Sequence, residues 1–190
     1  FSAVPLFWLG SVGDVHLNAG SPCIDAGNPL KNPDPDGSVA DVGAHVFDAS
    51  YVPRPVSYCE AGTHLGGCAA ELRSHGSPTL TGPDDFDLRA MDLPNRTYVL
   101  LLMAAAPAHQ AFGGELCLDP ASLSTLAPVL TGGNHGPPDC SGGLSYALDQ
   151  SWMASQGISA GSVRYFQLRY RDGLGGFSHS SALRVQFAAP

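Results

Sequence analysis

Residues 163–172, VRYFQLRYRD, carry the clearest period-two pattern in the chain. Successive side chains of a β-strand point to opposite faces of its sheet. One face of this segment takes Val163, Tyr165, Gln167, Arg169 and Arg171, and the other takes Arg164, Phe166, Leu168 and Tyr170. In residues 182–187, ALRVQF, an apolar face alternates in the same way with a polar one. The patterns predict strands at 163–171 and 182–187.

Six further segments have strand-like composition and are bounded by turn residues. They are 77–81, 86–91, 98–105, 114–118, 127–130 and 144–149. The apolar run at 98–107 is about half as long as a membrane-spanning helix, so it predicts a buried strand. Eight strands separated by turns predict an antiparallel, jelly-roll-like β-sandwich over residues 59–190. Residues 153–159 are compatible with one helical turn.

The composition agrees with an all-β protein. Glycine and proline number 23 and 16 among 190 residues, and only 14% of residues are charged, which favours many turns and few helices. The net charge is -8, and the nine basic residues are spread singly. Because no basic stripe is present, we expect no nucleic-acid partner. Because the longest apolar run is too short, we expect no membrane span.

Residues 48–58, DASYVPRPVSY, separate two unlike halves. Two prolines and no periodic pattern are typical of a linker, which we assign to 51–58. The segment 1–50 holds only short alternating apolar stretches, too few to close a core alone. We therefore expect this half to lean on structure upstream, and a chain that begins at Phe1 to be a fragment or a mature product.

Residues 20–41, GSPCIDAGNPLKNPDPDGSVAD, gather candidate chemical groups. Asp34, Asp36 and Asp41 surround a glycine in a pattern like that of calcium loops, and carboxylate oxygens are ligands that Ca²⁺ prefers. The closing glutamate of an EF-hand is missing. The alternative is that Asp34 and Asp36 cap their own backbone in Asx-turns. Ca²⁺ at these three aspartates is the one cofactor that the sequence indicates.

Other candidates lack the partners that catalysis needs. Asp25 has no assignable second carboxylate, so a turn role is expected. Cys23 has no recognisable histidine partner, and Ser141 lacks the G-x-S-x-G context of a nucleophile elbow. The seven histidines show no metal-binding spacing. We predict no catalytic residue and no enzyme activity in this chain.

The five cysteines lie in Gly- and Pro-rich surroundings without C-x-x-C pairs, which favours disulfides over zinc. We expect disulfides among Cys59, Cys68, Cys117 and Cys140, with Cys23 left over. Of the possible connectivities, the sequential one, Cys59–Cys68 and Cys117–Cys140, is preferred, and the nested and crossed ones stay open. Disulfides predict an oxidising, extracytoplasmic compartment.

Residues 5–44 resemble the C-terminal end of bacterial right-handed parallel β-helix proteins of the pectate-lyase-like kind. The matching positions are 5–7, 13–17, 20–22, 24–27, 34, 36–37 and 41–44. The resemblance implies that residues 1–50 are the terminal coil and cap of a solenoid, and that the upstream β-helix of the same polypeptide is a partner. An exposed apolar face is then expected around Val4, Leu6, Phe7 and Trp8.

Residues 58–187 resemble a C-terminal module of large secreted planctomycete proteins. The resemblance rests on YCEAGTHLGGC at 58–68, LCLDP at 116–120, DCSGG at 139–143 and the last strand pair. It implies an exported parent, extracellular or at the cell surface, and an accessory interaction or sorting module without assigned activity. Polysaccharide or cell-surface components are the expected partners.

Two alternatives to a purely structural role remain. One is a carbohydrate-binding module, because aromatic side chains can stack on sugars; the candidates are Tyr165, Phe166, Tyr170 and Phe177, although alternation places several of them in the core. The other is an accessory part of a polysaccharide lyase or glycosidase whose active site lies upstream.

Overall fold

The computed structural model describes residues 7–9, 14–17, 20–48, 51–62, 67–111, 115–171 and 176–188. The chain divides into two compact units, and the boundary lies between Pro53 and Arg54. This boundary falls inside the predicted linker 51–58. The linker is shorter than predicted, because β3 (Val56–Cys59) already belongs to the large sheet of the second unit.

In the first unit, β1 (Phe7–Leu9) and β2 (Asp14–Leu17) pair antiparallel. Residues 20–48 follow as turns and loops without a further strand or helix. A solenoid coil pairs in parallel with the coil before it, whereas the strand pair described in this unit is antiparallel. The terminal coil and cap over 1–50 therefore stay a prediction. Val4, Leu6 and the side chain of Trp8, predicted to form an apolar face, lie outside the described residues.

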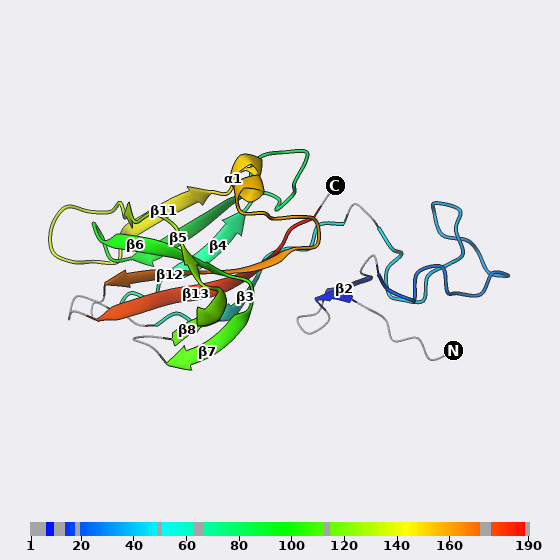
Figure 1. Ribbon diagram of the computed structural model, residues 1–190, viewed down its shortest axis with the longest axis horizontal. Coiled ribbons are helices and arrows are strands. Elements are labelled where there is room, and N and C mark those ends of the chain that lie inside the picture. Colours follow the sequence, from blue (N-terminus) through cyan, green and yellow to red (C-terminus); the bar gives the residue numbers. More distant parts are fainter. Residues whose placement is uncertain are drawn as a thin grey trace. The chain divides into compact units, whose positions relative to one another are not determined.

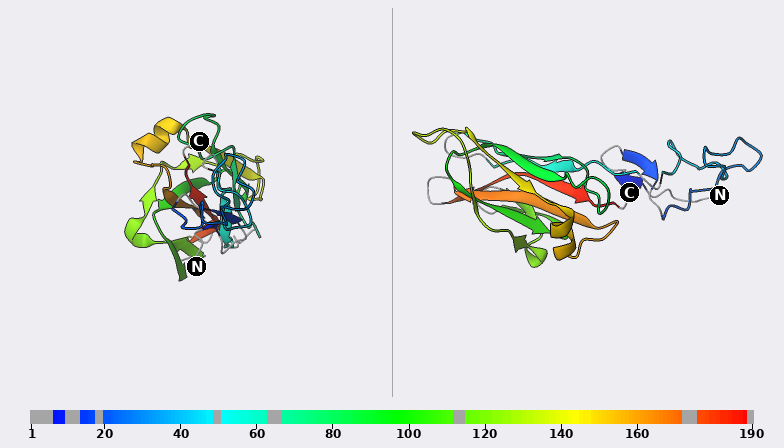
Figure 2. Two further views of the ribbon diagram at one scale, coloured as in Figure 1. Left: turned by 90° about the vertical axis from the view of Figure 1, so that its right-hand side faces the viewer. Right: turned by 90° about the horizontal axis from the view of Figure 1, so that it is seen from above.

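The second unit contains two main antiparallel sheets and a separate two-stranded hairpin (Figure 1; Figure 2). The small sheet has the order β11–β5–β4, with β4 at Glu71–His75, β5 at Asp87–Leu93 and β11 at Gly142–Ala147. The large sheet has the order β10–β6–β12–β13–β3, and β9 also pairs with β6. Its other strands are β6 (Tyr98–Ala104), β9 (Ser124–Thr125), β10 (Val129–Leu130), β12 (Val163–Arg171) and β13 (Phe177–Gln186).

The hydrophobic core lies between these sheets because each turns an apolar face inward. Phe166, Leu168 and Tyr170 of β12 are at most 1% exposed, and they share one cluster with Leu72 and Leu88 of the small sheet. The apolar side chains of one face of 163–171 are thus buried, and the predicted all-β sandwich is confirmed.

The connectivity differs from that of a jelly roll. Here β4 and β5 are neighbours in the small sheet, and β12 and β13 are neighbours in the large one. The chain crosses to the large sheet at β6, returns at β11 and crosses again at β12. A jelly roll has two four-stranded Greek keys, whereas this order is that of immunoglobulin-type sandwiches. The jelly-roll form of the prediction is therefore wrong.

A hairpin covers part of the outer face of the large sheet. It consists of β7 (Pro107–Ala111) and β8 (Glu115–Leu118), followed by a 3-10 helix at Pro120–Ser122. Leu118 packs with Leu102 and Ala104 of β6 in a second, smaller apolar cluster. The large sheet is therefore buried on its inner face and partly buried on its outer face.

The local predictions differ from the structure at several points. Strand β12 was predicted at its observed bounds, whereas 77–81 is not a strand and the chain before it forms β4. Strands β3, β4, β7 and β9 were not predicted. Helix α1 (Gln150–Ser155) begins before the predicted turn because the Asp149 carboxylate accepts the N–H of Trp152 at 2.7 Å. Among the described residues, no helix has the length and apolar character to cross a membrane.

Candidate functional site

The four cysteines of the second unit are all oxidised, but the sequential pairing is wrong. The bonds are Cys59–Cys117 and Cys68–Cys140, which interleave along the chain. Cys23 is buried and is not part of a disulfide, as the sequence predicts for the fifth cysteine.

The topology of the small sheet explains the second bond. Strands β4 and β11 both pair antiparallel with β5, so they run parallel to each other and begin at the same end of the sheet. Cys68 precedes β4 and Cys140 precedes β11, which brings the two loops together. The other pairings require Cys59 or Cys68 to lie beside later segments of the chain. The tertiary fold places both of them there, and the sequence does not show this.

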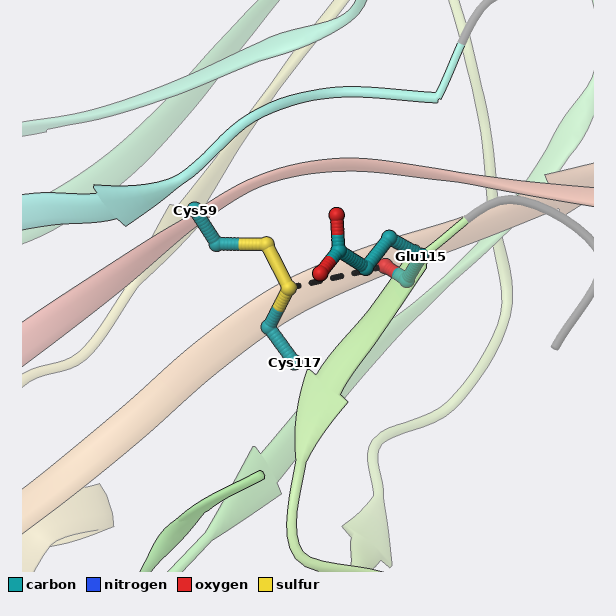
Figure 3. Close-up of side chains that lie close together, drawn as sticks. All are labelled: Cys59, Glu115 and Cys117. Atoms are coloured by element: carbon teal, nitrogen blue, oxygen red, sulfur yellow. Dashed lines mark hydrogen bonds between the residues drawn. A yellow bond between two sulfur atoms is a disulfide. The ribbon is translucent and has the colours of Figure 1, made fainter. Parts of the chain in front are cut away.

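The Cys59–Cys117 bond is part of the closest grouping of potential metal ligands. Both sulfur atoms and a carboxylate oxygen of Glu115 lie within 4.8 Å of one another (Figure 3). Metal binding by cysteine requires thiolates, and here the two sulfurs are bonded to each other. Within the described ranges, no other three or more His, Cys, Asp or Glu side chains gather this closely. The grouping is structural in its oxidised form.

The aspartates of the 34–41 segment bind the backbone of their own loop. Asp34 Oδ2 accepts the N–H of Asp41 at 3.0 Å. Asp36 accepts the N–H of Ser38 at 2.9 Å and its hydroxyl at 2.7 Å, and the backbone hydrogen bond from Ser38 is the main cause that lowers the pKa of Asp36. The bonds between Asp36 and Ser38 are those of an Asx-turn, whereas Asp34 binds a backbone N–H seven positions away.

Asp41 is the centre of this loop. One carboxylate oxygen accepts the N–H of Asp25 at 2.8 Å, and the other accepts the N–H of Phe47. The N–H of Asp41 also donates to Asp34. Asp41 therefore links three other residues of the loop, Asp25, Asp34 and Phe47. The three predicted calcium ligands are therefore engaged with backbone donors, and Ca²⁺ binding by them stays a prediction.

Backbone contacts close the same loop. Gly27 donates its N–H to Ala40 O at 2.7 Å, and Val42 donates to Cys23 O at 2.9 Å. A Cβ at Gly27 would lie 2.3 Å from Ala40 O, so only glycine permits this approach. Asp25 lies between these contacts in the left-handed region at φ 55°. Residues 23–27 thus fold against 40–42, and Asp25 occupies the predicted turn.

An open pocket of about 530 Å³ adjoins this loop in the first unit. The polar side chains of its wall belong to His16, Asp36, His45 and Asp48. The His16 ring stacks on His45 at 4.2 Å and on Tyr51 at 3.8 Å between centroids, with interplanar angles of 9° and 14°. Two parallel rings this near must lie on opposite faces of His16, so His16 is the middle of a three-ring stack.

The pocket offers a small polar ligand two carboxylates as hydrogen-bond acceptors and the ring nitrogens of two imidazoles. Sequence reasoning missed it, because His16 and His45 are 29 positions apart and show no ligand spacing. Only the stacking reveals that they belong together.

Ser141 lies in a polar loop that is held by its own hydrogen bonds. Its hydroxyl donates to Asp139 and accepts the N–H of Asn134, and this hydroxyl bond is the largest cause that lowers the pKa of Asp139. The amide of Asn95 donates to the carbonyls of Asn134 and Pro137 and accepts from the N–H of Asp139. The loop therefore orders the entry to β11.

The four aromatic residues proposed for sugar stacking do not form one surface. Phe166 and Tyr170 are buried in the core, whereas Tyr165 and Phe177 are half-buried. The exposed ring that sequence reasoning missed is Tyr98, which is 66% exposed at the start of β6. It was overlooked because it begins an otherwise apolar run.

No family model matches the chain, and neither a curated protein nor a solved structure matches it. The resemblances to a β-helix end and to a planctomycete module stay predictions.

Proposed function

We propose that this chain is a non-catalytic C-terminal region of a secreted or cell-surface protein, in which the second unit is an accessory interaction module. The observation that carries the proposal is the covalent closure of the second unit by two interleaved disulfides. Disulfides form and persist mainly outside the cytoplasm. A small sandwich on the outside of a cell gains stability from such bonds where a larger core is not available.

The way polar groups are used supports a structural role. Asp34 and Asp41 bind backbone N–H groups of their own loop. Ser141 and Asp139 bind each other and hold the loop before β11. Groups that sequence inspection ranks as chemical candidates are thus used to fix the conformation of the backbone.

For the first unit, we propose that it closes the end of a parallel β-helix formed by upstream residues. Two features support this role: the resemblance over 5–44, and the turn-rich loop in which 23–27 fold against 40–42. A cap ends a ladder of strands rather than extending it. A loop closed by its own carboxylates and backbone suits that task.

A degradation assay tests the non-catalytic assignment. The purified chain, incubated with a panel of acidic and neutral polysaccharides, should release neither new reducing ends nor unsaturated products. Turnover that copurifies with the chain and is lost in a variant of the pocket, His45→Ala, would overturn the proposal.

A deletion tests the accessory role. Removing residues 54–189 from the parent polypeptide should leave the upstream part folded and exported, and should reduce its retention on its polysaccharide or cell-surface partner. A parent that is retained equally well without these residues would contradict the role. The variant Cys68→Ser/Cys140→Ser, which lacks one of the two disulfides, is a second test, because it keeps the length of the chain and weakens only the module.

A further inference from the structure

A row of side chains crosses the outer face of the large sheet. Phe177 of β13 is paired with Arg171 of β12, and Leu130 of β10 is paired with Tyr98 of β6. The register of β12 and β6 pairs Tyr170 with Val99, so continuing it by one residue sets Arg171 opposite Tyr98. Paired residues of neighbouring strands point to the same face of a sheet.

This row points away from the core. Tyr170 and Val99, the preceding pair, are at most 1% exposed between the sheets, and side chains alternate along a strand. Tyr98 is 66% and Leu130 is 46% exposed. Large exposed side chains that adjoin on a regular sheet mark an interaction surface more often than scattered ones do.

Two guanidinium groups are held on one aromatic ring of the row. The guanidinium carbon of Arg169 lies 3.8 Å from the centroid of the Phe177 ring, and that of Arg171 lies 4.9 Å from it. Both are cation–π distances. Arg169 is two positions from Arg171 on the same strand, so its side chain is on the same face. The Phe177 ring therefore restrains two positive charges, each within 5 Å of its centroid.

These charges have no anionic partner in the described part of the chain. The arginine ion pairs found there are Arg73–Glu71 and Arg89–Asp87, both of the small sheet. The Nε of Arg169 is buried and has no hydrogen-bond partner. Two adjacent like charges repel each other and attract an anion. In a chain with 17 acidic and nine basic residues, this pair of arginines is a local exception.

We propose that this surface, defined by Tyr98, Arg169, Arg171 and Phe177 and named the Arg–Tyr face, binds an acidic polysaccharide. The planar guanidinium forks match the geometry of a uronate carboxylate. The exposed ring of Tyr98 offers an apolar face on which a pyranose ring can lie. A regular sheet face with strands about 4.8 Å apart accommodates an extended chain of sugars across the row.

An acidic peptide would satisfy the arginines but would leave the Tyr98 ring without a flat partner, so the combination favours a polysaccharide. This inference rests on the proposed function, because it names the ligand class of the accessory module.

Calorimetric titration of the full chain with alginate oligosaccharides tests the inference. The same oligosaccharides with their carboxyl groups reduced to alcohols are the matched ligand control. We expect binding of the acidic form that weakens as salt is added, and no measurable binding of the reduced form. Arg171→Gln should weaken binding about tenfold or more, because it removes a charge-assisted hydrogen bond. Tyr98→Ala should weaken binding severalfold.

Arg89→Gln is the matched protein control, since Arg89 is equally a strand arginine of this unit but pairs with Asp87 on the small sheet. It should leave the affinity unchanged. Arg171 and Tyr98 are exposed, so circular dichroism should show both variants folded. Equal weakening by Arg89→Gln would overturn the inference in favour of unspecific charge attraction. Binding of polyglutamate as tight as that of alginate, with no effect of Tyr98→Ala, would overturn it in favour of an acidic peptide.

The outcomes separate this inference from the proposed function. A chain that neither degrades nor binds alginate contradicts the Arg–Tyr face alone. A chain that degrades polysaccharides contradicts the proposed function, whatever it binds.

Discussion

Gln167 of β12 and Cys117 of β8 are joined by a hydrogen bond in which the N–H of Cys117 donates to Gln167 Oε1 at 3.0 Å. The Gln167 amide nitrogen donates in turn to the carbonyls of Glu115 and Ser180, both at 2.9 Å. The side chain is fully buried. It fixes the β7–β8 hairpin to the outer face of the large sheet at the position of the Cys59–Cys117 disulfide.

Replacing this amide should destabilise the second unit strongly. Gln167→Ala leaves buried backbone groups of β8 and β13 without partners, and we expect a loss of about 3 kcal/mol in the free energy of unfolding. Urea unfolding followed by near-UV circular dichroism measures it. Gln156→Ala, at an exposed position after α1, is the control and should change little. A Gln167→Ala protein as stable as the control would contradict the assigned role.

Removing the second disulfide should cost more. The Cys68–Cys140 bond spans 72 positions, and the loss of a loop of this size corresponds to about 4 kcal/mol in the chain-entropy account. Denaturant unfolding of Cys68→Ser/Cys140→Ser measures the effect. Cys23→Ser, which breaks no bond, is the control for loss of a cysteine. A double variant with unchanged stability would show that the bond constrains little.

Asp41 should order the loop without a metal ion. Asp41→Ala removes the acceptor for the N–H groups of Asp25 and Phe47, so both amides should lose protection in hydrogen–deuterium exchange. Lys31→Ala, at an exposed position of the same loop, should leave their protection as it was. Protection that survives Asp41→Ala would mean that other contacts hold the loop.

Calcium gives a separate prediction. Because Asp34, Asp36 and Asp41 are engaged with backbone donors, we expect the thermal midpoint of the chain to be the same in excess EDTA and in millimolar Ca²⁺. An upward shift with Ca²⁺ that Asp41→Asn abolishes would establish the calcium site that the D-x-D-G pattern suggests.

Acid should weaken α1 through its N-cap. The hydroxyl of Ser151, followed by the N–H of Trp152, lowers the pKa of Asp149 from its ordinary value of 3.8. A carboxyl group with a lowered folded-state pKa stabilises the fold above the unfolded-state value, and this contribution is lost as the pH falls through the folded-state value. Asp149→Asn keeps an acceptor but does not titrate. The stability difference between the two proteins should therefore shrink below about pH 4, and a difference that is constant with pH would refute the assignment.

The sequence could predict the features that depend on residues close together in the chain. It could not predict those that depend on contacts between distant segments. The alternation at 163–171 identified the strand and the two sets of side chains that share a face, because strand periodicity is local. It did not single out the buried set, and Gln167 of the other set is buried as well because it bonds the β7–β8 hairpin. The strand at 71–75, ELRSH, was missed because its single buried apolar residue is Leu72, and its place beside β5 is set by the tertiary fold. The helix cap was missed because Asp149 stands outside the stretch that was read as helical.

The candidate sites show the same limit. The Asx-turn interpretation needed only neighbours, and it agrees with the structure for Asp36. The Asp34 carboxylate instead binds the N–H of Asp41, seven positions away. The interleaved disulfides, the stack of His16 on His45 and the row from Tyr98 to Phe177 all join distant segments. Without knowledge of which strands are neighbours, the sequence offers no way to bring these residues together.

Disulfide mapping tests the central claim, that a covalently closed accessory sandwich forms the second unit. The chain is purified from an oxidising compartment, its free thiols are blocked, and its peptides are analysed by mass spectrometry without reduction. We predict linked peptides that contain Cys59 with Cys117 and Cys68 with Cys140, and a blocked Cys23. Linked peptides of Cys59 with Cys68, or four blocked thiols in that unit, would contradict the account.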